Sequence, residues 1–151
     1  MMQLTPPVSP RSSTGLLILL IEDNPDIADT FSDLLRLLGH RVHWAATGAG
    51  GIAAATTHRP DVIFLDIGLP DMTGYEVAVA IRAQPGDHPP RIIAVTGWSS
   101  PDHLARSRRA GIDHHATKPL TLPQLRGLMA DLPVRPRRRS DAALPPMSEG
   151  P

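Results

Sequence analysis

The chain has 151 residues, and its 15 basic and 15 acidic residues give a formal net charge of +0. This balance provides no general attraction to nucleic acid or to an anionic membrane. The absence of cysteine excludes disulfides and thiol chemistry and fits a cytoplasmic protein. The longest apolar run, Leu16–Ile21, is too short to span a bilayer, so we expect no membrane association and see no secretory signal.

The two ends of the chain differ in composition from its middle. Residues 1–14 are rich in Pro and Ser and are predicted to form a disordered N-terminal arm. Residues 133–151 are rich in Pro, Arg and Ser and are predicted to form a disordered tail. Within this tail, Arg135–Arg139 is either an acidic-partner or nucleic-acid contact or simply a solvated charge run. One folded domain is therefore predicted over residues 15–132, long enough for a real core.

Short apolar segments alternate with helical patterns throughout this domain. Apolar residues recur at helical spacing between Ile27 and Leu38, before Gly39. The predicted strands are Leu16–Ile21, Arg41–Ala45, Val62–Leu65, Ile92–Val95 and Ile112–Ala116. The other predicted helices are Gly50–Thr57, Thr73–Arg82, Pro101–Ala110 and Thr121–Ala130. Five βα repeats with continuous apolar strands indicate a doubly wound, three-layer α/β fold around a five-stranded parallel sheet.

Polar side chains gather where the predicted strands end. Glu22 and Asp23 follow the first strand, Asp66 follows the third, Thr96 the fourth, and Lys118, the only lysine, the fifth. In an open parallel sheet, ligands bind outside the carboxyl ends of the strands. Carboxylates at one edge repel one another unless one is protonated or a cation lies between them, and hard oxygen ligands suit Mg²⁺. We therefore predict one site built from these strand ends.

The order Glu22-Asp23, Asp66, Thr96, Lys118-Pro119 resembles the receiver domain of bacterial two-component response regulators. The turn Leu69–Gly74, which follows Asp66, belongs to the same pattern. The resemblance covers the whole predicted domain and implies a flavodoxin-like fold. It also implies a cytoplasmic phosphoprotein that takes part in phosphorelay signalling and is not an enzyme in its own right.

The resemblance implies a role for each acid. Asp66 would be the phosphoacceptor, since a carboxylate can attack a phosphoryl group to give an aspartyl-phosphate. Mg²⁺, or Mn²⁺ in its place, would be held by Asp23, Glu22, Asp66 and the backbone carbonyl of Gly68. The donor would be a histidine kinase or a histidine phosphotransfer protein.

The resemblance also assigns the residues around the phosphoryl group. Lys118 would pair with one phosphoryl oxygen, and the Thr96 hydroxyl would hydrogen-bond another. The Lys118-Pro119 peptide bond would be cis, as in the family.

Two positions depart from the family pattern. His115 stands where an aromatic residue usually swings inward with the threonine, so Thr96 and His115 are the expected switch residues, with a titratable group in place of an aromatic one. Gly68 and Trp98 border the expected path of the hydrolytic water, and we hypothesise that Trp98 slows dephosphorylation. The alternative for Trp98 is surface packing on the fourth helix. Asp113-His114-His115 lacks a fixed fourth ligand and is interpreted as surface and switch residues rather than as a zinc site.

The signalling output is expected to come through other proteins. Little chain follows the domain, so we expect a single-domain regulator without its own DNA-binding module, acting through a downstream protein target, onward phosphotransfer or a phosphate-sink role. The face of the fourth helix, fifth strand and fifth helix is expected to bind a partner or to form a homodimer. Arginines on the fourth and fifth helices favour an acidic partner over the alternative of an ordinary solvated face. They are Arg106, Arg108, Arg109 and Arg126. The alternative function is a pseudo-receiver that binds a partner without phosphorylation.

Several other interpretations compete for single motifs. Gly48–Ala53 fits a dinucleotide-binding G-x-G-x-x-A turn, but this leaves most of the strand-end residues unexplained. An aspartate-nucleophile phosphatase would carry a second acid where Gly68 stands. Asp26 is interpreted as a residue of a helix first turn, and Asp71 as a turn former rather than a second phosphorylation site.

Overall fold

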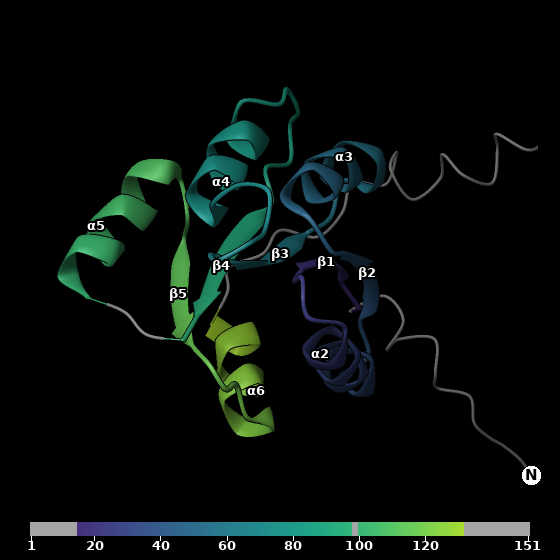
Figure 1. The fold of residues 1–151 in the computed structure, drawn as a ribbon. Coiled ribbons are helices and arrows are strands. Elements are labelled where there is room, and N and C mark those ends of the chain that lie inside the picture. The colour runs from purple at the N-terminus through teal and green to yellow at the C-terminus, as the bar shows by residue number, and fades with distance from the viewer. Residues whose placement is uncertain (1–14, 98–99, 132–151) are drawn as a thin grey trace, which may run out of the picture.

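The computed structural model describes residues 15–97 and 100–131. Its centre is a five-stranded sheet in the order β2-β1-β3-β4-β5, in which every pair of neighbours is parallel (Figure 1). The strands are β1 (Leu17–Ile21), β2 (Arg41–Ala45), β3 (Val62–Asp66), β4 (Arg91–Thr96) and β5 (His114–Thr117). This strand order is that of flavodoxin-like proteins, which confirms the predicted doubly wound fold.

Helices cover both faces of the sheet. They are α2 (Pro25–Leu37), α3 (Gly48–His58), α4 (Gly74–Arg82), α5 (Pro101–Ala110) and α6 (Leu122–Asp131). In Figure 1, α2 and α6 lie on one face, and α3, α4 and α5 lie on the other. The fourth and fifth helices of the sequence prediction are therefore α5 and α6.

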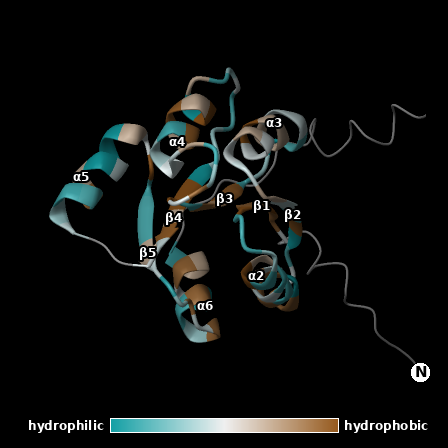
Figure 2. Ribbon diagram, in the orientation of Figure 1, coloured by the Kyte–Doolittle hydropathy of each residue, from teal (hydrophilic) through white to brown (hydrophobic). Residues whose placement is uncertain are grey.

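The core consists of two aliphatic clusters, one on each face of the sheet. Successive side chains of a strand point to opposite faces, so each central strand supplies both clusters. Leu19 and Ile21 of β1 pack with α3 and α4, whereas Ile18 and Leu20 pack with Phe31 of α2. Figure 2 shows the resulting contrast between the apolar central strands and the hydrophilic surface of α5. The buried middle of the sheet is a rigid base for the side chains at its edge.

The two edge strands differ from the expectation of strands buried on both faces. Of the residues of β2 only Ala45 is buried, and no residue of β5 is fully buried. Each has a neighbour on one side only. β5 also begins at His114, two residues later than predicted. Gly111, at φ 90°, ends α5, and the Ile112 amide closes that turn by donating to the Ser107 carbonyl.

One helix boundary also differs from the sequence prediction. α3 begins at Gly48 rather than Gly50, because the Thr47 side chain caps it by accepting from the Gly50 amide. The Lys118-Pro119 peptide bond is cis, as the resemblance implied. No helix within residues 15–97 and 100–131 is long and apolar enough to cross a membrane. The predictions for residues 1–14, Trp98 and residues 133–151 lie outside the described residues.

Candidate functional site

Three acids meet at the carboxyl edge of the sheet. Glu22 and Asp23 follow β1, and Asp66 is the last residue of β3. Each offers one carboxylate oxygen, and these oxygens all lie within 4.8 Å of one another. Glu22 and Asp66 are buried, whereas Asp23 is exposed. This set of hard oxygen donors is buried at Glu22 and Asp66 and exposed to solvent at Asp23. It fits a divalent cation such as Mg²⁺.

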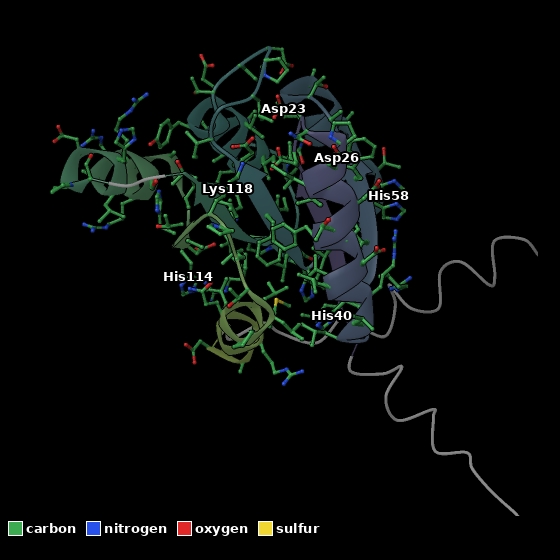
Figure 3. The ribbon with its side chains drawn as sticks, turned by 60° about the horizontal axis from the view of Figure 1, so that its bottom comes forward. Asp23, Asp26, His40, His58, His114 and Lys118 are labelled. Carbon is green, nitrogen blue, oxygen red and sulfur yellow. The ribbon has the colours of Figure 1, made fainter. Side chains whose placement is uncertain are left out.

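Lys118 reaches the same cluster from the end of β5. Its Nζ lies 3.2 Å from Glu22 Oε1 and 3.5 Å from Asp66 Oδ1. The backbone amide of Lys118 donates to the Thr96 carbonyl at 2.6 Å, which ties the end of β5 to the end of β4. Figure 3 shows Lys118 and Asp23 at the same end of the molecule, with His40 beyond the other end of α2. The only lysine in the chain thus pairs with two of the predicted site acids.

Glu22 is held in an unfavourable environment for a negative charge. Burial raises the pKa of Glu22, and the neighbouring Asp66 charge raises it further. The Asn24 amide, which donates to Glu22 Oε2 at 3.1 Å, and the Lys118 ammonium lower that pKa and oppose the effect. The cluster therefore carries more negative charge than Lys118 alone balances, and a bound cation would relieve it.

Two contacts that support Glu22 were not predicted from the sequence. The Asn24 side chain caps α2 by accepting from the Asp26 and Ile27 amides, and this places the Asn24 amide against Glu22. Asp26 lies in the first turn of α2, as interpreted from the sequence, and outside the acidic cluster. Trp44 Nε1 donates to the Glu22 carbonyl at 2.7 Å. The Asn-Pro pair is a sequence signal for the cap, but no local pattern points to Trp44.

Gly68 leaves open space beside Asp66. A Cβ added to Gly68 would meet no atom within 4 Å, and the Gly68 amide donates to Asp66 Oδ1 at 3.2 Å. Gly74 packs against the backbone of Asp66, and a Cβ at Gly74 would lie 2.8 Å from the Asp66 carbonyl oxygen. Gly68 therefore leaves open space next to the phosphoacceptor candidate, and Gly74 allows the start of α4 to pack closely against its backbone.

The two predicted switch residues lie on β4 and β5. Thr96 ends β4 in register with Thr117, and in the described part of the chain its hydroxyl makes no hydrogen bond to the acids. Nε2 of His115 is buried and has no hydrogen-bond partner within residues 15–97 and 100–131. Burial, and then the charge of His103, lower the pKa of His115. Within the fold, His115 therefore binds a proton less readily than a solvated imidazole.

A contact between α4 and α5 has no signal in the sequence. The Tyr75 hydroxyl and His103 Nδ1 are 2.8 Å apart, and the Arg106 guanidinium lies 4.2 Å from the centre of the Tyr75 ring. This contact links the first turn of α4 to α5.

The structure does not support a zinc site at Asp113-His114-His115 or a dinucleotide site at Gly48–Ala53. The Asp113 carboxylate forms an ion pair with Arg82 at 2.7 Å and another with Arg91 at 3.5 Å. Among the described residues, Asp113, His114 and His115 belong to no group of three that could hold a metal ion.

At the start of α3, the carboxylate of Asp71 accepts from the Gly48 amide at 2.8 Å and the Ala49 amide at 2.9 Å. A dinucleotide phosphate would need these amides, so the dinucleotide interpretation is excluded. Asp71 is a turn residue, as predicted, but it also caps a distant helix.

Residues 18–130 match the model of the response regulator receiver domain family. The chain belongs to this family. It is 35% identical over 127 residues to the transcriptional regulatory protein KdpE of Mycobacterium tuberculosis, covering 84% of this chain and 54% of the relative. It is 29% identical over 107 residues to the polar-differentiation response regulator DivK of Brucella anthropi, covering 71% and 87%. The chain spans about half the length of the mycobacterial regulator.

Solved structures show the same receiver fold. The chemotaxis protein CheY4 of Vibrio cholerae matches with a TM-score of 0.74 and 28% identity, covering 78% of this chain and 98% of that one. The receiver domain of the sensor histidine kinase PA1611 of Pseudomonas aeruginosa matches with a TM-score of 0.70 and 33% identity, covering 77% and 95%. That structure holds a magnesium ion in its active site cleft.

Proposed function

We propose that this receiver domain accepts a phosphoryl group on Asp66 from a histidine kinase or a histidine phosphotransfer protein. The observation that carries the proposal is the Lys118 ammonium, which lies 3.5 Å from Asp66 Oδ1 beside a cluster of acids. A buried carboxylate with a lysine on one side and open space on the other can act as a nucleophile toward phosphorus. The protein is a signalling phosphoprotein that assists its own phosphorylation rather than an enzyme acting on other substrates.

The acidic cluster fits Mg²⁺ or Mn²⁺. Asp23, Glu22 and Asp66 would hold the ion through carboxylate oxygens, and the Gly68 carbonyl would complete the protein ligands. When bound, the cation neutralises the carboxylates and the oxygens of the incoming phosphoryl group.

Phosphoryl transfer makes one bond and breaks another. An oxygen of the Asp66 carboxylate forms a bond to phosphorus, while the phosphorus–nitrogen bond of the donor phosphohistidine breaks and its electron pair returns to the imidazole. The Lys118 ammonium, already beside Asp66, balances the phosphoryl oxygens, and Thr96 at the end of the intervening β4 donates its hydroxyl. We propose that Thr96 and the partly buried His115 then move together as the switch.

The exposed cations of α5 and α6 support a protein partner as the output. Arg108, Arg109 and Arg126 are exposed and form no ion pair with any residue that the structure describes. We propose that the α5–β5–α6 face binds an acidic downstream protein or a second copy of the chain after phosphorylation, in the cytoplasm. Onward phosphotransfer is the other output of the same chemistry.

Intact-mass measurement tests the proposal. The full chain is incubated with phosphoramidate or a cognate kinase, with Mg²⁺ and separately with a chelator. Gain of one phosphoryl group only with Mg²⁺ is the expected result. No gain from either donor, together with unchanged tryptophan fluorescence on adding Mg²⁺ and beryllofluoride, would contradict the proposal and favour a pseudo-receiver that binds its partner without phosphate.

A further inference from the structure

The loop between β3 and α4 carries Gly68, whose amide donates to Asp66 Oδ1 at 3.2 Å but which has open space where a side chain would lie. Gly68 is exposed, a Cβ there would meet no atom within 4 Å, and glycine is the residue with the greatest backbone freedom. At the base of the loop, Gly68 forms an antiparallel bridge with Thr73, and the Gly74 amide donates to the Ile67 carbonyl at 2.8 Å. These contacts close the loop on itself but leave its tip to be held from elsewhere.

Asp71 at the tip is tied to a different element of the fold. Its Oδ1 accepts from the Gly48 amide at 2.8 Å, and its Oδ2 accepts from the Ala49 amide at 2.9 Å. Both carboxylate oxygens are therefore bound to the first two amides of α3, 23 and 22 residues away in the chain. These two bonds, that to Ala49 first, lower the pKa of Asp71, so the carboxylate stays ionised. Charge-assisted hydrogen bonds of this kind are stronger than neutral ones.

Apolar packing reinforces the same attachment. Met72 packs against the core beside Gly48, and a Cβ on Gly48 would collide with Met72 Cγ and lie 2.9 Å from Val77 Cγ2. One turn further along α3, a Cβ on Gly51 would lie 2.5 Å from Ile21 Cδ1 of β1. The start of α3 is therefore packed closely against both the loop tip and β1, the strand that leads into Glu22 and Asp23. If Asp71 only formed a turn, the loop would not need to be bound to the start of α3.

We propose that Asp71 is a positioning residue of the metal site, which fixes the Gly68 loop by binding it to the start of α3. This inference rests on the proposed function, because it concerns the cation of that site. With Asp71 in place, the loop is tethered at its base and at its tip, and Gly68 is held beside Asp66 before the ion arrives. Without Asp71, ion binding must also order the loop, and the affinity falls.

Binding of Mn²⁺ alone, followed by electron paramagnetic resonance of the free ion, tests the proposal on the full chain. Asp71→Asn keeps one acceptor oxygen and Asp71→Ala keeps none. We expect the Mn²⁺ dissociation constant to rise in both variants, and by about tenfold in Asp71→Ala, where the rise is larger. Tenfold is the lower end of the effect typical of residues that support metal ligands indirectly. Amide hydrogen exchange of Gly48, Ala49 and Gly68 is measured on the same samples and should accelerate.

Thr47→Ala is the matched control. It removes the other cap at the same helix end, where Thr47 Oγ1 accepts from the Gly50 amide at 3.0 Å, but leaves the loop attached. Thr47→Ala should lower the melting temperature and leave the Mn²⁺ dissociation constant unchanged. Equal changes in the Asp71 and Thr47 variants, or none in the Asp71 variants, would overturn the positioning role. Failure of the wild type to bind Mn²⁺ would instead overturn the proposed metal site itself.

Discussion

The Lys118 ammonium reaches Asp66 across an intervening strand. Lys118 follows β5 and Asp66 ends β3, yet their charged atoms are 3.5 Å apart over the end of β4, where Thr96 lies. A phosphoryl group on Asp66 would therefore be placed between the lysine and the threonine. A compact ammonium on a flexible stem can follow that group, whereas a planar guanidinium would need a fixed partner geometry.

Replacement of Lys118 should slow phosphorylation without unfolding the protein. Lys118→Ala removes one fixed stabilising charge, so the rate of phosphorylation by phosphoramidate should fall about 100-fold. Lys118→Arg should recover only part of this rate because of its different shape. The control is Arg126→Ala, an exposed cation of α6, which should keep the wild-type rate. A wild-type rate in Lys118→Ala would exclude the role assigned to the lysine.

Glu22→Gln should separate stability from metal binding. Glutamine keeps an acceptor for the Asn24 amide but removes a buried charge next to Asp66, and Lys118 retains Asp66 as its partner. Without metal, we expect the free energy of unfolding to rise by about 1 kcal/mol. The Mn²⁺ affinity should fall, because one anionic ligand is lost. Urea unfolding measures the first quantity; a variant less stable than the wild type would show that the Glu22 charge is well compensated.

A pair of glycine substitutions tests the close approach beside Asp66. Gly74→Ala would place a Cβ 2.8 Å from backbone atoms of Asp66 and Ile67, and it should destabilise the fold by about 2 kcal/mol. Gly127 lies in α6, and a Cβ there would meet no atom within 4 Å. Gly127→Ala should therefore stabilise the fold by about 1 kcal/mol through helix propensity. Thermal unfolding of both variants provides the comparison. Equal effects would mean that the Gly74 contact can relax.

Stability should fall in mildly acidic solution partly through His40. Its Nδ1 accepts the Leu16 amide at 3.0 Å, and burial lowers the pKa of His40 from its ordinary value of 6.5. The unfolded chain then binds a proton at a higher pH than the folded protein, so stability is full above 6.5 and is lost as the pH falls from there through the folded-state pKa. His40→Gln does not titrate and should lose less stability between these limits. Parallel urea profiles for the two proteins would contradict this assignment.

The central strands and the site acids follow from sequence because their signals are local. β1 and β3 are continuous apolar runs ending in acids, and both are fully buried as expected. The contacts that were missed depend on residues far apart in the chain. Asp71 meets Gly48, and Trp44 reaches the Glu22 carbonyl, only because the sheet order brings β2 and β3 to either side of β1. The start of β5 was misplaced because Ile112 is apolar but buried in the turn that closes α5.

Locating the phosphoryl group on the chain is the most direct test of phosphorylation at Asp66. The phosphorylated wild type is reduced with borohydride, which converts an aspartyl-phosphate into homoserine, and its peptides are sequenced by mass spectrometry. Homoserine at position 66, with no phosphoryl uptake by Asp66→Asn, is the predicted result. Homoserine at Asp23 or Asp71, or full uptake by Asp66→Asn, would contradict it.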